Sequence, residues 1–278
     1  MNDPEIRVIK ARSGWQIIDW KELREYKDLF YFLTLRDIKI QYKQTVFGFL
    51  WAIIQPLVLM VIFTFVLGKL AKAPTDELPS AIFHYTVLPA WTYFSNALNQ
   101  SGQSLVASAN MITKVYFPRL IVPMAPVLAK LIDMVIAYVI LIPFMFYYEI
   151  VPSASILMFP VLILLLIITA AGAGMWLTAL AVKYRDVKYI IGFTLQALMW
   201  ITPVTVPVST IQDKFGETWR LVYGIYPMGG IIESIRASLV GAAIPWDLLG
   251  ISAATSIIMF VTGMYYFKRT ERVFADVA

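Results

Sequence analysis

The sequence predicts an all-α membrane protein with six transmembrane helices, from its composition, its apolar segments and its distribution of positive charge. The chain has 278 residues, of which 59% are hydrophobic and 15% are charged. A helix needs roughly 20 mostly apolar residues to cross the hydrocarbon core. Backbone groups inside lipid must be hydrogen-bonded within their own segment, so long apolar runs favour helices. The predicted spans are centred near residues 47–68, 82–105, 121–147, 156–182, 190–208 and 248–267.

Lysine and arginine residues lie mainly on one side of these spans. They are concentrated before the first span, in the loops after the second and fourth spans, and after the last span. Such asymmetry marks the cytoplasmic side, so both termini are expected there. Residues 1–46 then form a cytoplasmic N-terminal segment, 47–267 the six-helix transmembrane domain, and 268–278 a cytoplasmic tail. The net charge of +5 reflects this orientation and is no argument for nucleic-acid binding.

Residues 20–43, directly before the first span, have the pattern of an amphipathic helix. Apolar side chains recur near helical spacing, with charged residues between them. The helix is expected to lie in the cytoplasmic interface of the membrane. A solvated helix leading into the membrane is the alternative. The apolar positions are Leu23, Tyr26, Leu29, Phe30, Leu33 and Ile40.

Two short cytoplasmic loops, 110–119 and 183–188, are candidates for docking a protein partner. Charged loops often only set topology, and that interpretation stays open. The first loop, however, combines aromatic residues, a proline and two cations, and arginine and tyrosine are enriched at the centres of protein interfaces. The docking candidates are Lys114, Tyr116, Phe117, Arg119 and Arg185.

The second predicted span contains more amides than a lipid-facing helix tolerates. Unpartnered amides are costly in hydrocarbon, so this span should face protein or a lumen. Aromatic rings next to amides also suit sugars, whose CH faces stack on rings while their hydroxyls bond amides. Packing and interfacial belts are the alternative for the rings. Helical spacing prevents all the candidates from sharing one face, and Trp91 and Phe94 fit one stripe best. The channel-lining candidates are Trp91, Tyr93, Phe94, Asn96, Asn99 and Gln100.

Lys130 and Asp133 lie within the third predicted span, on one face of the helix. Charged residues inside a span are costly, and two of opposite sign lower each other's cost. A structural ion pair is the favoured interpretation, and a proton or ion relay is the alternative. In the fourth span, the small residues at 170–174 permit close helix packing.

The connection from 209 to 246 is expected to contain short re-entrant helices before the last span. Its apolar run is too short to span and is interrupted by charge. Irregular backbone at membrane depth is tolerated only beside protein or a water-filled cavity. This makes the segment a candidate for an outer gate, with Tyr226, Pro227, Glu233 and Arg236 as its candidate residues.

The sequence argues against an enzyme. Gly68 and Lys69 are followed by Leu70, so no G-x-x-x-x-G-K-[ST] phosphate-binding loop is present. Cysteine is absent and His84 is the only histidine, which excludes metal sites built from these residues; His84 is expected near the outer interface without a catalytic role. A membrane-embedded transferase would need clustered carboxylates or histidines. A proton-coupled transporter would be expected to show internal repeats, and none is convincing.

Five short motifs in order resemble the membrane subunit of bacterial type-2 ABC exporters of cell-surface polysaccharide. The resemblance covers residues 20–276 and is closest to the O-antigen (lipopolysaccharide) permeases, with capsule and teichoic-acid permeases related. One departure is Tyr226 before Pro227, where the family commonly has asparagine; it concerns the outer gate. The motifs are 35–48 (LRDIKIQYKQTVFG) followed by Trp51 and Gln55-Pro56, 114–119 (KVYFPR), 183–187 (KYRDV), 227–236 (PMGGIIESIR) and 267–276 (FKRTERVFAD).

The resemblance implies a homodimer in the bacterial inner membrane, joined to two cytoplasmic ATPase subunits that bind ATP and Mg. The chain itself would hold no cofactor or metal. The substrate would be a polysaccharide on undecaprenyl diphosphate, passing through a channel between the two permease copies. The alternative is a type-2 ABC permease for another substrate, such as teichoic acid, capsule, a lipid or a drug.

Overall fold

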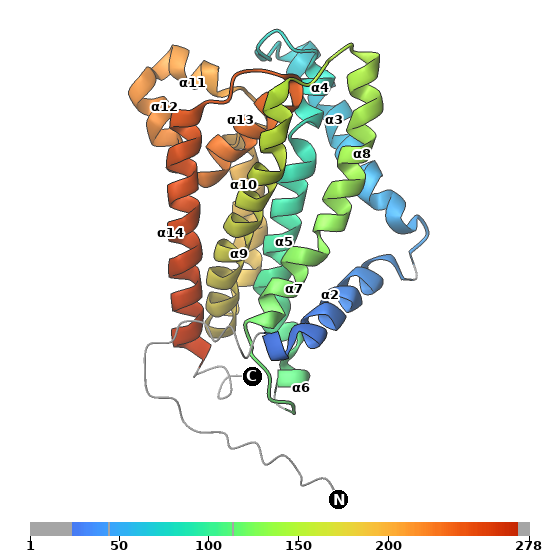
Figure 1. The fold of residues 1–278 in the computed structure, drawn as a ribbon, viewed down its shortest axis with the longest axis vertical. Helices are drawn as coiled ribbons and strands as arrows, with labels where there is room; N and C mark the ends of the chain where they lie inside the picture. Colours follow the sequence, from blue (N-terminus) through green and yellow to red (C-terminus); the bar gives the residue numbers. More distant parts are fainter. Residues whose placement is uncertain (1–23, 44, 113, 272–278) are drawn as a thin grey trace, which may run out of the picture.

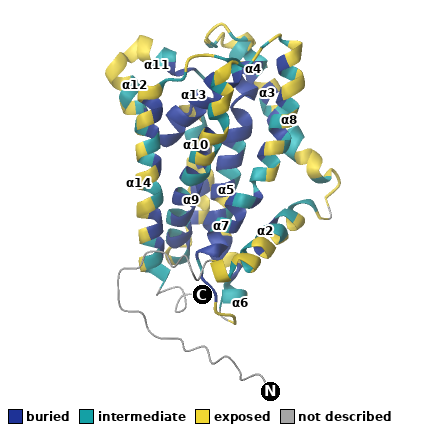
Figure 2. Cartoon of the chain, in the orientation of Figure 1, coloured by how far each residue is buried: buried dark blue, intermediate teal, exposed yellow. Residues whose placement is uncertain are grey.

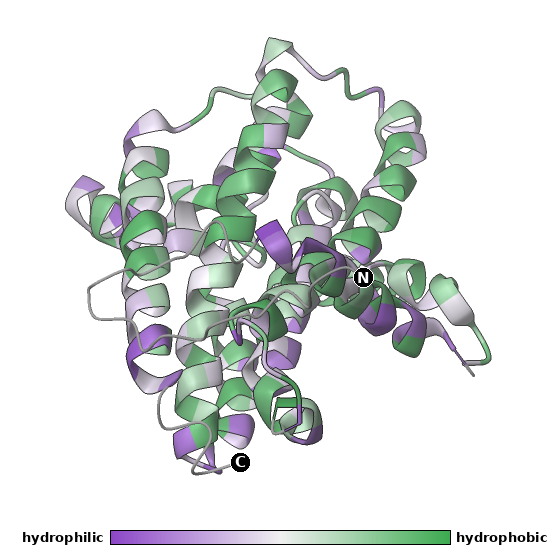
Figure 3. Ribbon diagram, turned by 60° about the horizontal axis from the view of Figure 1, so that its bottom comes forward, coloured by the Kyte–Doolittle hydropathy of each residue, from purple (hydrophilic) through white to green (hydrophobic). Residues whose placement is uncertain are grey.

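The protein is a bundle of helices that contains no β-strand in the part of the chain that the structure describes (Figure 1). In the computed structural model these residues are 24–43, 45–112 and 114–271. Four helical stretches are long and apolar enough to cross a membrane, and they coincide with four of the six predicted spans. They are Gly48–Leu70, Ile121–Tyr147, Ala154–Lys183 and Trp246–Thr270. The long helices are predominantly hydrophobic along their lengths (Figure 3).

The elements follow one another along the bundle with short connections. The helices are α2 (Lys27–Tyr42), α3 (Trp51–Phe63), α4 (Ser80–Tyr85), α5 (Leu88–Ala107), α6 (Ala109–Ile112), α7 (Ile121–Ala129), α8 (Leu131–Tyr147), α9 (Phe159–Lys183), α10 (Val187–Ile201), α11 (Val208–Phe215), α12 (Glu217–Tyr223), α13 (Pro227–Val240) and α14 (Trp246–Thr270), with shorter helical turns η1 (Gly48–Leu50), η2 (Thr64–Leu70) and η3 (Ala154–Met158).

The second and fifth predicted spans differ from single long helices. The second is divided into α4 and α5. Pro89 lies in the first turn of α5, where a backbone N–H would have no partner within the helix, so proline is tolerated there. The fifth was expected to be helical over 190–208, but α10 ends at Ile201 and α11 starts only at Val208. Pro203 and Pro207 explain this break, because each lacks an N–H and disfavours helical geometry in the residue before it.

Helix α5 lies at the centre of the bundle and positions the candidate site. It packs against α7, α8, α9 and α10. Buried residues are concentrated on α5, α9 and α13, whereas α14 and α8 expose large parts of their surfaces (Figure 2). Helix α13 is too short to span and is almost wholly buried against α9 and α14. The apolar core therefore joins the predicted outer segment to the long helices.

Helices α9 and α14 approach each other backbone to backbone. A Cβ added at Gly172 would lie 2.6 Å from the Cα of Phe260, and a Cβ at Gly263 would meet the carbonyl group of Gly172. The rings of Trp176 and Tyr266 stack beside this contact, with their centroids 4.3 Å apart. The close packing predicted from the small residues at 170–174 is confirmed, because only residues without a side chain fit there.

Helix α2 runs obliquely beside the lower end of the bundle (Figure 1). It confirms a helix before the first span, although residues 20–23 of the predicted helix lie outside the described residues. Leu33 is buried against Ile121 and Ala125 of α7. Ile40 differs from the predicted apolar face, since it is 65% exposed. The contacts with α7 hold the helix against the bundle near its N-terminal half.

Candidate functional site

One face of α5 lines two neighbouring polar cavities. The first has a volume of about 370 Å³ and lies between α5, α2 and α7. Its polar lining consists of amides, hydroxyls and three charged side chains. These residues are Asn96, Asn99, Gln100, Gln103, Ser104 and Ser108 from the α5 region, with Arg36, Asp37 and Lys130.

The second cavity, of about 250 Å³, continues along the same helix toward its N-terminal end. It is closed by the last turn of α2, the start of α3 and the start of α8. Asn96 and Lys130 line both cavities and therefore lie at the boundary between them. The other polar residues of the second cavity are Gln41, Gln55, Thr92, Tyr93 and Asp133.

The α5 residues of both cavities form a single helical stripe. Thr92, Asn96, Asn99 and Gln103 are separated by three or four residues, which places their side chains on one face. The structure thus brings together Asn96, Asn99 and Gln100 of the predicted lining. It adds Thr92 and Gln103, which sequence reasoning did not select although their three- and four-residue spacing could have identified them.

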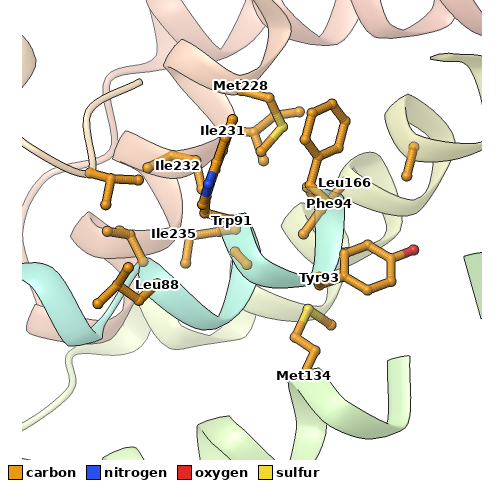
Figure 4. Packing of buried hydrophobic residues seen from close by; sticks show 14 of the residues in the cluster. Leu88, Trp91, Tyr93, Phe94, Met134, Leu166, Met228, Ile231, Ile232 and Ile235 are labelled. Atoms are coloured by element: carbon orange, nitrogen blue, oxygen red, sulfur yellow. The ribbon is translucent and has the colours of Figure 1, made fainter. Parts of the chain in front are cut away.

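The aromatic members of the predicted lining are placed differently. Trp91 and Phe94 lie on the opposite face of α5, where each is at most 4% exposed and lines neither cavity. They pack among residues of α13 such as Met228 and Ile231 (Figure 4). The pair that the sequence placed most clearly toward the lumen is therefore part of the apolar core in this structure. The orientation of these two side chains is determined by their apolar neighbours on α13, which is distant in the sequence.

Tyr93 lies between the two faces of the helix. Its ring is buried and lines the second cavity, and its hydroxyl donates to the carbonyl oxygen of Val127 at 3.2 Å. Figure 4 shows the ring beside Met134 of α8. Tyr93 therefore ties α5 to the α7–α8 region, next to the boundary between the cavities.

The predicted pairing of Lys130 and Asp133 is confirmed, and both are held by the end of α2. The lysine nitrogen lies 3.6 Å from a carboxylate oxygen of Asp133, and each side chain is less than 15% exposed. Lys130 donates to Oε1 of Gln41 at 2.6 Å, and Nε2 of Gln41 donates to Oδ2 of Asp133 at 2.6 Å. The hydroxyl of Tyr42 donates to the other carboxylate oxygen. Sequence analysis could not pair Gln41 and Tyr42 with Asp133, because they are about ninety positions away from it in the chain.

Tyr42 acts as a neutral donor in this cluster. Burial, together with the hydrogen bond to the Asp133 carboxylate, raises the pKa of the Tyr42 hydroxyl above its ordinary value. A phenol beside a carboxylate keeps its proton, since ionising it would place two negative charges together. The carboxylate of Asp133 therefore has a cation and two neutral donors around it.

The docking candidates lie at the end of the bundle that carries α6 and the last turns of α9 and α14 (Figure 1). Lys114 and Arg185 are exposed, and Tyr116 is 66% exposed. Arg119 donates to the backbone carbonyl of Glu271 at 2.6 Å, which ties its loop to the end of α14. Phe117 differs from the prediction, because its ring is 4% exposed and packs in an apolar cluster, so it anchors the loop instead of presenting a surface.

The outer-gate candidates gather around α13 and the connection 202–207. Arg236 pairs with Glu233 at 2.7 Å, and its guanidinium lies 3.7 Å from the centre of the Phe83 ring. It also donates to the carbonyl oxygens of Phe83 and Pro203. Glu233 and Arg236 line a third cavity of about 440 Å³, together with Asp76, Ser209 and Arg220.

The remaining outer candidates begin α13. Tyr226 precedes the helix, and its hydroxyl lies 3.0 Å from that of Thr202. Pro227 is the first residue of the helix, where its fixed φ is favourable. The nearby His84 is buried, with Nδ1 2.8 Å from the carbonyl oxygen of Val204. No group of three or more histidine, aspartate or glutamate residues that could hold a metal was found within the described ranges.

Comparison with known proteins identifies the family. The family described as ABC-2 type transporter matches residues 28–240. The chain belongs to this family. Among curated proteins it is similar to the O-antigen export system permease protein RfbA of Klebsiella pneumoniae, with 26% identity over 90% of this chain and 95% of that protein. A protein of the same name from Myxococcus xanthus is 24% identical over 90% of this chain and 96% of its own length.

These matches confirm the resemblance found in the motifs. The chain is a transmembrane permease of the ABC-2 type, a multi-pass protein of the bacterial inner membrane. The family is a membrane component of ABC transporters and not a catalytic subunit. Membership implies association with an ABC ATPase and a transported substrate.

Proposed function

We propose that this chain is the permease subunit of an ATP-driven exporter that moves polysaccharide of the O-antigen type, linked to undecaprenyl diphosphate, across the cytoplasmic membrane. The observation that carries the proposal is the polar face of α5 in an otherwise apolar bundle. From Thr92 to Ser108 this face extends about 24 Å at 1.5 Å per residue. That is most of the roughly 30 Å thickness of a hydrocarbon core.

The chemistry of this face suits a hydroxyl-rich substrate. Asparagine and glutamine side chains both donate and accept hydrogen bonds, as sugar hydroxyls do. A pocket for a lipid or drug is expected to be mostly apolar with few polar groups. Asn96, Asn99, Gln100 and Gln103 instead give the first cavity a run of amides. The alternative of a type-2 ABC permease for a lipid or drug is less well supported for this reason.

The proposed assembly is a homodimer with two cytoplasmic ATPase subunits that bind ATP and Mg. The polymer passes between the two permease copies, along the α5 faces. In this arrangement each copy has six spans and cytoplasmic termini, with the α4–α5 and α10 regions as the second and fifth spans. Helices α11 to α13 form the re-entrant outer segment. Tyr226, Pro227, Glu233 and Arg236 belong to its gate.

The ATPase subunits are proposed to dock at the α6 end of the bundle. Three exposed docking candidates occupy this end: Lys114, Tyr116 and Arg185. The partly buried Arg119 lies beside them. A tyrosine and arginine surface is typical of interface centres. The Tyr116→Ala variant is expected to reduce co-purification of the ATPase subunit without affecting membrane insertion.

Reconstitution tests the proposal directly. The purified chain alone is expected to hydrolyse no ATP, and co-expression with an ATPase subunit is expected to give a stable complex that does. Hydrolysis by the isolated chain above a mock preparation would contradict the division of roles. Vesicles containing the complex are then supplied with ATP and either lipid-linked polysaccharide or a lipid or drug substrate. Transport of the latter alone would favour the alternative.

Cysteine labelling tests the path. The chain has no cysteine of its own, so single cysteines can be placed on either face of α5. Asn99→Cys is expected to react with a membrane-impermeant thiol reagent, and polymer in transit is expected to protect it. Trp91→Cys, on the buried face, serves as the matched control and should stay unreactive. Equal inaccessibility of both positions in every state would move the path elsewhere.

A further inference from the structure

The two cavities on α5 meet at Asn96 and Lys130, and the Lys130 side chain is hydrogen-bonded to Gln41 of a different helix, α2. We propose that Gln41 and Tyr42 are positioning residues that hold Lys130 and Asp133 as a closed partition between the cavities, and that movement of α2 opens it. The proposal rests on the proposed function, because a partition matters to transport only if the substrate follows the α5 face.

The two cavities occupy successive lengths of one helix. From Asn96 to Ser108, the first cavity follows about 18 Å of α5, and from Pro89 to Asn96 the second follows about 10 Å. Their linings share only Asn96 and Lys130. A continuous polar face therefore becomes two separate spaces at the level of the Lys130 side chain.

Gln41 is suited to closing this boundary because its amide satisfies both charges. Its carbonyl oxygen accepts from Lys130 and its NH₂ group donates to Asp133, each at 2.6 Å. No other uncharged side chain except asparagine offers an acceptor and a two-proton donor on one rigid group. The bridge holds Lys130 and Asp133 at 3.6 Å, a separation at which their direct contact is loose.

The position of the partition coincides with an irregularity in the helix that carries it. Helix α7 ends at Ala129 and α8 begins at Leu131, so Lys130 lies at the junction. Pro126 lies inside α7 and lacks the N–H that would bond to the preceding turn. Such a junction can change its bend, and it carries the two charges that Gln41 holds.

Helix α2 connects the partition to the loop around Tyr116 at the α6 end of the bundle. Its 16 residues correspond to about 24 Å of helix. At its start the hydroxyl of Tyr26 donates to the backbone carbonyl of Tyr116 at 3.4 Å, and Leu33 packs on α7. A displacement of the loop around Tyr116 would thus reach Gln41 and Tyr42 through one continuous helix.

The other charges beside the partition are already paired. Arg36 lies 2.9 Å from the carboxylate of Asp37, and both line the first cavity. The charges facing the boundary, Arg36 and Lys130 against Asp37 and Asp133, balance in number. An approaching uncharged sugar unit of the polymer therefore meets hydrogen-bonding groups and no excess charge, and the hydrogen bonds from Gln41 and Tyr42 are the ones that must break.

Accessibility of single cysteines tests the partition. Gln103→Cys reports on the first cavity and Thr92→Cys on the second, since each lines only one of them. Inside-out vesicles carrying the permease with its ATPase subunit, without nucleotide, are treated with a membrane-impermeant maleimide. With Gln41 and Tyr42 present, Gln103→Cys, at an exposed position, is expected to react, and Thr92→Cys to be protected. Equal reaction rates at the two positions would overturn the proposal.

Variants of the α2 side chains complete the test. Gln41→Ala is expected to increase labelling of Thr92→Cys about tenfold, because it removes two hydrogen bonds to charged groups. Tyr42→Phe, which keeps the ring, is expected to act in the same direction with a smaller change. Ile40→Ala, on the same helix at an exposed position, is the matched control and should leave labelling unchanged. Unchanged labelling in both Gln41→Ala and Tyr42→Phe would show that α2 does not hold the partition.

The labelling assay is independent of substrate. It requires neither polymer nor transport, so a different cargo would leave its result intact while contradicting the proposed function. Labelling of Gln103→Cys at an unchanged rate in each variant shows that the chain is folded and inserted. If Gln41→Ala is not inserted, the isosteric Tyr42→Phe variant decides the outcome.

Discussion

Two largely buried ion pairs of the same spacing are held in opposite ways: the inner pair, Lys130 and Asp133, beside α5, and the outer pair, Glu233 and Arg236, in α13. Lys130 and Asp133 are held by side chains from α2. Arg236 and Glu233 are held by backbone carbonyls and by the ring of Phe83. The contacting distances also differ, at 3.6 Å for the inner pair and 2.7 Å for the outer pair.

This difference indicates which of the two ion pairs can rearrange. Backbone carbonyls are fixed by the fold, so the guanidinium of Arg236 has a rigid socket between α4, α13 and the 202–207 connection. Side chains on an oblique helix can withdraw together when that helix moves. The inner pair is therefore adjustable, whereas the outer pair is a fixed joint within the proposed outer gate, although both line polar cavities.

The largest expected effect comes from breaking the outer joint. Arg236→Leu leaves Glu233 buried without its cation and two carbonyls without a donor, which should reduce the free energy of unfolding by about 3–5 kcal/mol. Thermal unfolding in detergent and membrane yield measure this. Arg220→Leu is the matched control, because its partner Asp247 is 45% exposed and solvent can replace the lost arginine. Equal losses in the two variants would contradict the idea of a fixed joint.

A double-mutant cycle tests the inner pair with a smaller expected effect. Lys130→Met and Asp133→Leu each leave one buried charge that Gln41 still bonds, so each should cost about 1–3 kcal/mol. Removing both charges should cost less than the worse single change. Unfolding and export are measured for all four proteins. A double variant as defective as the worse single one would favour a direct role of the charges in transport.

The smallest expected effects compare two hydroxyl groups. Tyr42→Phe removes a donor from a carboxylate and should cost about 1.5–3 kcal/mol, whereas Tyr226→Phe removes a bond to the neutral hydroxyl of Thr202 and should cost about 1 kcal/mol. Thermal unfolding gives both values. A larger loss of stability for Tyr226→Phe than for Tyr42→Phe would contradict this prediction.

The sequence predicted what depends on local pattern. Apolar runs identified the long helices, and the spacing of Lys130 and Asp133 identified their pairing. It did not predict contacts between distant segments. The contact of Gln41 with Asp133 depends on the packing of α2 beside the α7–α8 junction. The side chain of Trp91 faces α13 because its apolar packing partners lie there. Hydropathy alone also extended the fifth predicted span from α10 to Val208, since residues 202–207 carry no charge although their prolines prevent a helix.

The glycines between α9 and α14 limit how the bundle can rearrange. The two backbones are in contact at Gly172 and Gly263, and two aromatic rings stack beside them. Sliding either helix along the other would make side chains clash with the neighbouring backbone. Helices α9 and α14 should therefore move together as one rigid body. Shape changes during a transport cycle are then left to the elements around it, above all α2 and the bent α7–α8 helix. A permease that moves a substrate across the membrane while staying sealed to ions then has a fixed pair of helices against which the other helices can move.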